Sequence, residues 1–143
     1  DAFLASANIR LLRDEAVLLG GEVYLYGRPD AQRPGRGVEV RKTPTEFVEG
    51  LDAGKPILVL DHQPRELEAL AAAGVDVDLC GHTHDGQMFP GNLTVRLFWE
   101  NACGCLRVGS MHSIVTSGVG LFGPNMRVAT RAEICPITIH FMN

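Results

Sequence analysis

Two histidines separated by one residue follow a short apolar segment in the stretch DLCGHTHDGQ, residues 78–87. Neutral imidazole is a common ligand of divalent metal ions, and the glycine ahead of this pair lets the backbone turn tightly beside an ion. A third histidine, His62, ends another apolar segment, PILVLDH. His62, His82 and His84 are therefore candidate metal ligands; the alternative is that each is an ordinary core or surface histidine.

The elements between these histidines predict that they meet. Within residues 55–84, PILVLDH has the continuous apolar character of a buried parallel strand, residues 64–74 have helical spacing, and VDVDLCG alternates like a second strand. A right-handed crossover makes the two strands parallel neighbours, so His62 and His82 lie at the carboxyl edge, where open α/β sheets bind ligands. In extended backbone, His84 would project to the same side as His82.

Shorter segments on both sides predict the rest of an α/β domain with a mixed sheet. Thr43 is a candidate cap of a helix with Pro44 at its first position, and a Pro/Gly/Arg-rich surface loop precedes it. His112 and His140 lie outside the expected edge, and we expect them not to join the metal site. The expected strands are 8–12, 15–21, 22–27, 104–109, 112–120 and 132–141, the helix is 43–54, and the loop is 28–37.

Composition limits the classes of function. The chain has 143 residues, 45% of them hydrophobic, which fits one compact domain. A net charge of -4 argues against nucleic acid as a general partner. The longest apolar runs are far shorter than the roughly 20 residues that cross a bilayer, and the compartment stays open between cytoplasmic and membrane-associated. The spacing of the four cysteines matches no zinc knuckle or redox pair, so we expect reduced thiols.

The motifs together resemble a known family. GHTHDGQ, with LDHQP upstream and VTSGVGLFGPNMRVATRAEI downstream, is similar to the C-terminal half of a calcineurin-like metallophosphoesterase. The resemblance covers about residues 9–141 and is closest to the bacterial branch with GHTHGGQ and a closing Arg-Pro-Glu-Ile. It implies an α/β fold, the C-terminal half of a two-sheet α/β/β/α sandwich, and hydrolysis of a phosphomonoester, phosphodiester or pyrophosphate.

The same resemblance implies a pair of divalent ions, Mn, Zn or Fe. Carried over to this chain, His62 and His82 would bind one ion and His84 the other. In the family, the two ions share a bridging hydroxide that attacks phosphorus while the ions neutralise the phosphoryl oxygens.

Departures from the family pattern are also informative. Asp85 stands where the branch usually has glycine, and Ala132 stands where it has proline. Asp85 is either a solvated loop carboxylate or a further polar contact at the rim of the site. The family's first three motifs, Asp-x-His, Gly-Asp-x-x-Asp and Gly-Asn-His followed by an acid, do not occur in residues 1–55.

Those three motifs supply the bridging aspartate, an asparagine ligand and the histidine that protonates the leaving group. We therefore expect residues 1–143 to be the C-terminal portion of a metallophosphoesterase domain, with Asp1 not a natural start. Three neutral histidines carry no charge to hold two dications together, so this chain alone should bind at most one ion and have little or no activity. The alternative function is a non-catalytic protein-binding module with a vestigial metal site.

The segment 88–99, which follows the histidine motif, contains many apolar residues. It either folds back over the sheet edge or forms a lip that contacts a lipid-like or membrane-borne substrate. Arg96 and Arg127 are candidates to assist with phosphate. The expected partners are a small phosphate ester or a lipid-linked substrate. If half of a sandwich is missing, exposed strands should also favour self-association or pairing with the N-terminal half.

Overall fold

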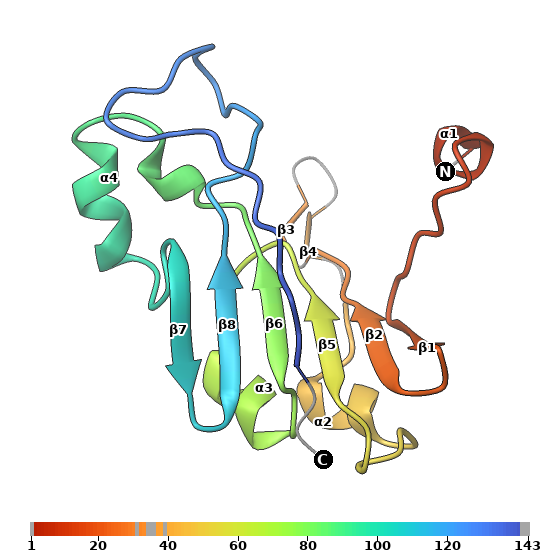
Figure 1. Cartoon of the computed structure of the whole chain (residues 1–143). Helices are drawn as coiled ribbons and strands as arrows, with labels where there is room; N and C mark the ends of the chain where they lie inside the picture. Colours follow the sequence, from red (N-terminus) through yellow and green to blue (C-terminus); the bar gives the residue numbers. More distant parts are fainter. Residues whose placement is uncertain (1, 31, 34–36, 39, 141–143) are drawn as a thin grey trace.

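The computed structural model describes the chain except residues 1, 31, 34–36, 39 and 141–143, and its centre is a six-stranded mixed sheet (Figure 1). Four neighbouring strands run parallel, and an antiparallel strand closes each edge. The predicted α/β class with a mixed sheet is confirmed. In sheet order the strands are β1 (Glu15–Leu19), β2 (Val23–Gly27), β5 (Ile57–Leu60), β6 (Val77–Cys80), β8 (Met111–Val115) and β7 (Gly104–Val108).

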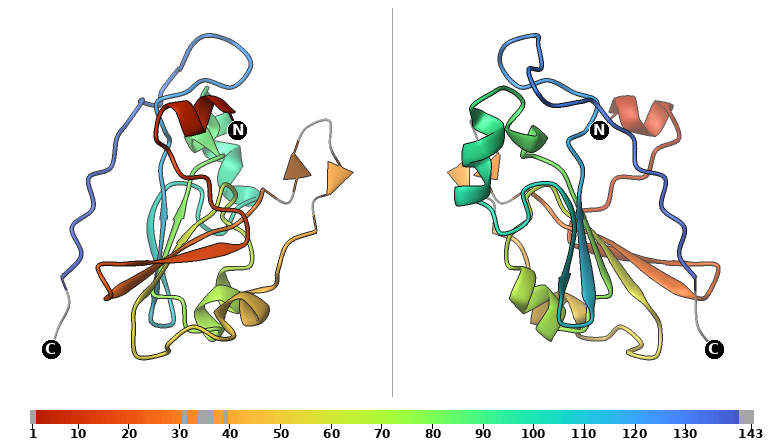
Figure 2. Two further views of the ribbon diagram at one scale, coloured as in Figure 1. Left: turned by 90° about the vertical axis from the view of Figure 1, so that its right-hand side faces the viewer. Right: turned by 60° about the vertical axis from the view of Figure 1, so that its left-hand side comes forward.

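Two helices pack on one face of this sheet. Helices α2 (Pro44–Val48) and α3 (Leu67–Ala72) lie on the same side, whereas the C-terminal segment runs along the other (Figure 2). None of the helices in the described part has the length and apolar character that a membrane crossing needs. The remaining elements are α1 (Ala2–Ser6), α4 (Gly91–Thr94), the 3₁₀ turns η1 (His84–Gly86) and η2 (Val95–Leu97), and a small sheet of β3 (Gln32–Arg33) and β4 (Gly37–Val38).

The strand–helix–strand unit predicted for residues 55–84 is confirmed. Strands β5 and β6 are parallel neighbours, with Leu58 opposite Val77 and Leu60 opposite Leu79, and α3 connects them. This pairing brings the carboxyl ends of the two strands to the same edge of the sheet.

Both predicted helices are shorter than expected because left-handed residues bound them. The Thr43 cap is confirmed: its hydroxyl accepts a hydrogen bond from the Glu46 backbone, and the Glu46 carboxylate accepts one from the Thr43 backbone. Helix α2 ends before Gly50, which has a φ of 88°. Helix α3 begins after Glu66, with a φ of 60°, and not at Pro64. A left-handed residue cannot continue a right-handed helix.

Two expected strands are wrong. Residues 8–12 lie outside any strand, and residues 132–140 are extended without a ladder in the described part of the chain. The latter segment instead crosses the open face of the sheet, and its apolar residue Ile134 is 82% exposed. Alternating apolar residues predict an extended backbone, but a strand also needs a neighbour with which to pair. His140 therefore does not lie in a strand.

The hydrophobic core fills the space between the sheet and the two helices. Tyr26 of β2 stacks on Phe47 of α2 with ring centroids 4.1 Å apart, and Leu70 of α3 is completely buried. Burial of aromatic and branched side chains from three elements fixes how the helices dock. The core cluster comprises Tyr26, Phe47, Ile57, Val59, Leu67, Leu70, Val75 and Met111.

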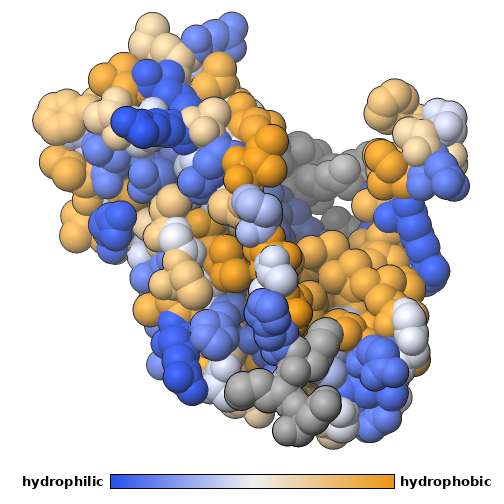
Figure 3. All heavy atoms as spheres, viewed as in Figure 1, coloured by the Kyte–Doolittle hydropathy of each residue, from blue (hydrophilic) through white to orange (hydrophobic). Residues whose placement is uncertain are grey.

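The opposite face of the sheet is also apolar, but it is largely open. The register places Leu25 beside Leu58 and Leu60 beside Leu79 on this face, and Leu60 is 39% exposed. Figure 3 shows hydrophobic residues gathered over β5, β2 and β1 beside the C-terminal segment. The sheet thus has one face packed by helices and one face that no helix covers in the described residues.

Replacing Leu70 by alanine tests the core. Because Leu70 is fully buried, Leu70→Ala should lower the free energy of unfolding in urea by about 2–5 kcal/mol. Leu97→Ala, at a position 80% exposed, is the control and should change it by less than about 0.5 kcal/mol. Equal effects of the two substitutions would contradict this assignment of the core.

Candidate metal centre

A pocket of about 360 Å³ opens at the carboxyl edge of β5 and β6, and all three predicted histidines line it. His62 follows β5, His82 follows β6, and His84 lies one turn further along the chain. Asp30 and Trp99 also line the pocket. The parallel strands therefore bring together residues that lie far apart in the sequence.

His62 and His82 are in direct contact. Nε2 of His62 lies 3.0 Å from Nδ1 of His82, and the rings meet edge to face with centroids 4.8 Å apart. The two loops are joined beneath the rings, where the Gly81 N–H donates a hydrogen bond of 3.2 Å to the carbonyl of His62. At this distance the two nitrogens form a hydrogen-bond pair in which the tautomer decides which ring donates.

The backbone of the histidine motif is not extended, contrary to the sequence prediction, and φ is positive at both of its histidines. The φ angles are 67° at His82, 51° at His84 and 51° at Asp85, values that L-residues rarely adopt. The glycine that the resembling branch has at the position of Asp85 suits such a φ, and aspartate tolerates it better than most residues. Gly86 has no alternative, because a Cβ there would lie 2.3 Å from the backbone of Gly91.

His84 lines the same pocket, but its ring is not part of the edge-to-face contact between His62 and His82. Its ring stacks beside Phe122 with centroids 6.5 Å apart. Nδ1 of His84 is buried and has no hydrogen-bond partner among the described residues. A buried nitrogen without a partner is costly, and a water or an ion bonded to it would offset this cost.

Burial favours the neutral form of His82 and His84. Burial lowers the pKa of His82, and the neighbouring ring of His62 lowers it further. Burial also lowers the pKa of His84, and the charge of Arg127 adds to this effect. Neutral imidazole is the form that binds metal, so both shifts favour a metal-binding state near neutral pH.

Asp30 is a site residue that the sequence reasoning missed. Its carboxylate lies 4.0 Å from Nε2 of His62, and the side chain of Gln63 donates a hydrogen bond of 2.9 Å to it. A parallel pairing of the strand at 22–27 with the strand before His62 would have placed Asp30 correctly. Because β2 is parallel to β5, the residues that follow β2 lie at the same edge as His62. The prediction of a surface loop at 28–37 obscured this position.

A buried network of charges supports the loop that carries His62. The side chain of Asp61 is completely buried and accepts hydrogen bonds of 3.0 Å from both Arg28 and Arg41. Glu66 bridges the same two arginines at 2.8 and 2.7 Å. Burial alone would raise the pKa of Glu66, but the hydrogen bonds and charges of the arginines lower it overall. Asp61 also accepts from the backbone of His62, which fixes the end of β5.

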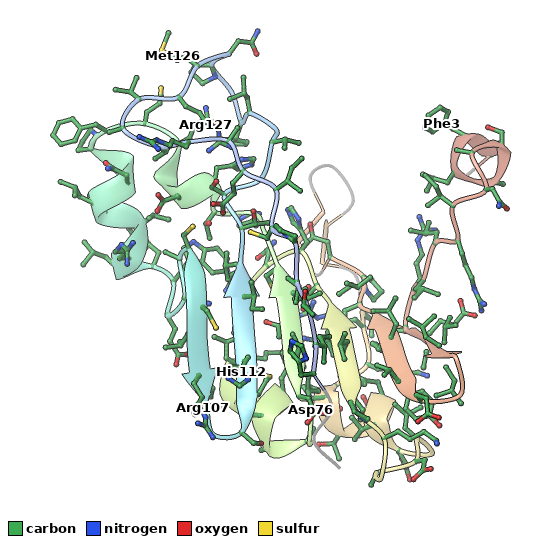
Figure 4. The ribbon with its side chains drawn as sticks, viewed as in Figure 1. Phe3, Asp76, Arg107, His112, Met126 and Arg127 are labelled. Carbon is green, nitrogen blue, oxygen red and sulfur yellow. The ribbon has the colours of Figure 1, made fainter. Side chains whose placement is uncertain are left out.

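Arg127 has a structural role in the described chain. One terminal nitrogen donates to the carbonyl of His84 at 3.2 Å, and the other donates to the carbonyls of Ser117, Gly118 and Gly120 at 2.7–3.0 Å. Figure 4 shows Arg127 among the loops above the strand ends, inside the tip that bears Met126. These bonds fix the loop after β8 to the histidine motif and occupy both terminal nitrogens that were expected to assist with phosphate.

Glu133, in the closing Arg-Ala-Glu-Ile segment, also holds the loop after β8. The Glu133 carboxylate accepts from the backbone of Ser117 and the hydroxyl of Thr116, at 2.8 and 3.1 Å. The backbone hydrogen bond from Ser117 is the main reason that the pKa of Glu133 lies below its usual value.

The spacing of the His62 and His82 nitrogens suits a single metal ion, but the set of ligands is incomplete. Two ligand nitrogens about 2.1 Å from one ion lie roughly 3.0–3.4 Å apart, which agrees with the 3.0 Å between His62 and His82. However, no group of three histidine, cysteine, aspartate or glutamate side chains within the described residues is arranged to hold an ion. The pocket therefore brings His62 and His82 into contact, with His84 and Asp30 also lining it, and the described residues do not complete a metal-binding group.

A second buried carboxylate lies below this edge. Asp78 of β6 is completely buried, and it accepts hydrogen bonds from the thiol of Cys80 at 3.2 Å and the hydroxyl of Ser113 at 3.4 Å. Burial raises the pKa of Asp78 to about 6, and the same burial raises the pKa of the Cys80 thiol. Cys80 therefore remains a protonated donor, and all four cysteines of the chain are free thiols.

Comparison with known proteins agrees with the motifs. An uncharacterized metallophosphoesterase of Aquifex aeolicus is 33% identical over 139 residues, which are 96% of this chain and 53% of that protein. A transmembrane protein with metallophosphoesterase domain from Danio rerio is 39% identical over 112 residues, 74% of this chain and 24% of that protein. An uncharacterized metallophosphoesterase of Helicobacter pylori strain J99 is 32% identical over 138 residues, 93% of this chain and 36% of that protein.

The comparisons also set limits. No family model matches the chain, and no solved structure matches it. The chain spans between about a quarter and a half of the length of these relatives. It is thus related over most of its own length to proteins named metallophosphoesterases, which are hydrolases.

The raised pKa of Asp78 predicts a pH dependence of stability. Between about pH 4 and 6 the folded protein retains a proton that the unfolded chain has released, so the free energy of unfolding should fall as pH rises through this window. Asp78→Asn removes this titration, and its stability relative to the wild type should rise by about 2–3 kcal/mol from pH 4 to 7.

Urea unfolding at several pH values measures this difference. Glu22→Gln, at an exposed position in the turn after β1, is the matched control and should show no such trend. A constant difference between Asp78→Asn and the wild type from pH 4 to 7 would refute the assignment.

Proposed function

We propose that the chain belongs to the calcineurin-like metallophosphoesterases and forms the C-terminal portion of such a domain over residues 1–143. The observation that carries this proposal is the contact of His62 with His82 at a parallel sheet edge, in a chain related to proteins of that name. The reaction would be hydrolysis of a phosphomonoester, phosphodiester or pyrophosphate.

In this proposal the histidines are metal ligands. His62 and His82 would hold one divalent ion, and His84, whose Nδ1 is buried without a partner, would contribute to a second. Bound Mn, Zn or Fe ions would supply Lewis-acid polarisation of the phosphoryl group and activation of water. The buried network around Asp61 would keep His62 in position, and the lowered pKa values of His82 and His84 would keep their rings neutral.

The open face of the sheet supports the proposed two-sheet sandwich. Leu25 and Leu60 would be covered by a second sheet, as the helices cover the other face. A sheet buried on both faces is the usual setting of neighbouring parallel strands. The longer relatives contain additional chain that would supply this sheet and the further metal ligands.

Metal binding tests the assignment of the ligands. Titration calorimetry with Mn²⁺ and with Zn²⁺ should show at most one ion bound per chain, and His82→Ala should weaken binding at least about tenfold. His112→Ala is the control, because His112 is exposed and lies toward the opposite end of the sheet (Figure 4). Equal affinities of His82→Ala and His112→Ala would remove the metal site and favour the non-catalytic protein-binding module.

Activity tests the second part of the proposal. The 143-residue chain and the full-length Aquifex aeolicus relative should be compared with a nitrophenyl phosphodiester in Mn²⁺. We expect turnover by the chain to be lower by at least about 100-fold, because Asp30 is the one carboxylate that lines its pocket in the described structure, and no side chain there is placed to protonate a leaving oxygen.

The decisive variant is again His82→Ala in the 143-residue chain. Turnover comparable to that of the relative, abolished by this substitution, would show that the chain carries a complete catalytic site and would contradict the proposal.

A further inference from the structure

A third strand brings an acidic side chain to the histidine pocket. Asp30 lies three residues after β2, whereas His62 follows β5 and His82 follows β6. All three residues line the pocket, and Asp30 has the one carboxylate among its lining residues in the described structure. The motifs that suggested the metal ligands assign no role to Asp30, although the fold places it beside them.

Gln63 fixes the orientation of this carboxylate. Gln63 is buried, and its amide nitrogen donates a hydrogen bond of 2.9 Å to Oδ1 of Asp30. Its amide oxygen accepts a hydrogen bond of 2.8 Å from Nε of Arg65, whose guanidinium also lies 4.6 Å from the ring centre of Trp99. Because a guanidinium only donates and a carboxylate only accepts, the amide has a single orientation that satisfies both partners. Gln63 is therefore a specific support of Asp30.

The main chain of the loop that carries Asp30 is fixed as well. The Arg28 N–H donates a hydrogen bond of 2.9 Å to the carbonyl of Leu60, the last residue of β5. The side chain of Arg41 donates to the carbonyl of Pro29 at 3.1 Å. Hydrogen bonds to both the main chain and the side chain thus define where the carboxylate of Asp30 lies.

The carboxylate faces the side of His62 on which an ion would bind. Oδ2 of Asp30 lies 4.0 Å from Nε2 of His62, the same nitrogen that lies 3.0 Å from Nδ1 of His82. A carboxylate that supports a ligand ring from behind contacts the other ring nitrogen. Two atoms that each lie about 2.1 Å from one ion are at most about 4.2 Å apart, so Asp30 is close to the position of a ligand.

The charge of Asp30 acts on the histidines, unlike that of the neighbouring carboxylates. Asp61 and Glu66 each bond to the same two arginines of the buried network. Burial and the ring of His62 lower the pKa of His82, whereas the charge of Asp30 acts in the opposite direction. A negative charge that favours a proton on this ring attracts a metal cation beside it for the same electrostatic reason.

The distance indicates how the carboxylate would reach an ion. A separation of 4.0 Å is too long for a hydrogen bond, and Asp30 does not complete a group of three metal ligands with His62 and His82 in the described structure. A water molecule bound to an ion would span such a gap, since carboxylates accept hydrogen bonds from water. Outer partners of this kind tune the affinity of metal sites.

We propose that Asp30 is the anionic partner of an ion held by His62 and His82, that it acts through a water on that ion, and that Gln63 positions it. This inference rests on the proposed function. Two neutral imidazoles give a dication no compensating charge, whereas Asp30 supplies one negative charge at the same pocket. Ions that retain water, such as Mn²⁺, should depend on Asp30 more than Zn²⁺, which imidazole suits better.

Metal binding to variants of Asp30 tests the proposal. In titration calorimetry of the 143-residue chain, Asp30→Asn should weaken Mn²⁺ binding at least about tenfold, and Zn²⁺ binding by a smaller factor. Asp30→Glu keeps the charge and should restore part of the Mn²⁺ affinity. The matched control is Glu100→Gln, which removes one negative charge from an exposed residue next to Trp99, outside the pocket lining, and should bind both ions like the wild type.

A double-mutant cycle tests the role of Gln63. Gln63→Met keeps the size of the side chain but removes both hydrogen bonds, so it should weaken Mn²⁺ binding several-fold. In the Asp30→Asn background the same substitution should have little further effect, because Gln63 would act through Asp30. Additive losses would overturn the positioning role. Urea unfolding of each variant shows whether the fold is retained.

The outcomes separate this inference from the proposed function. Wild-type affinity for Mn²⁺ in Asp30→Asn, together with a loss in His82→Ala, would overturn the role of Asp30 and leave the metal site in place. Equal losses in Asp30→Asn and Glu100→Gln would show that only net charge matters and would also overturn it. A loss for Zn²⁺ as large as that for Mn²⁺ would contradict action through water. Failure of the wild type to bind either ion would contradict the proposed function itself.

Discussion

The parallel pairing of β5 with β6 is the constraint on which the site depends. Because parallel neighbours end at the same edge, the residues after each strand meet, and Nε2 of His62 lies 3.0 Å from Nδ1 of His82. Helix α3 makes this pairing possible, since it carries the chain back across the core through Leu67 and Leu70. The apolar core on one face thus determines the polar chemistry at the edge.

Buried charge gives this edge its rigidity. Asp61 lies between Arg28 and Arg41 under the backbone of His62, and each partner compensates for the cost of burying the others. A site that binds an ion needs ligands whose positions are fixed before the ion arrives. The positive φ angles at His82, His84, Asp85, Gly86 and Gln87 are a second source of fixed geometry, held by the hydrogen bonds of Gln87 and Arg127.

The two faces of the sheet differ in a way that agrees with a larger protein. One face is packed by α2 and α3, whereas Leu60 on the other face is 39% exposed. The relatives are about two to four times as long as the matched part, so they have the chain needed to cover such a face. The proposed sandwich and metal pair both place this edge between the sheet and further structure.

A local apolar pattern and the rule for right-handed crossovers are sufficient to predict the β5–α3–β6 unit and the meeting of His62 with His82. The sequence did not determine whether residues 132–140 pair in a sheet, since alternation predicts an extended chain but not its neighbour. The position of Asp30 beside His62 and the ion pairs around Asp61 depend on tertiary structure. Loops that are distant in sequence become neighbours only when parallel strands align their ends.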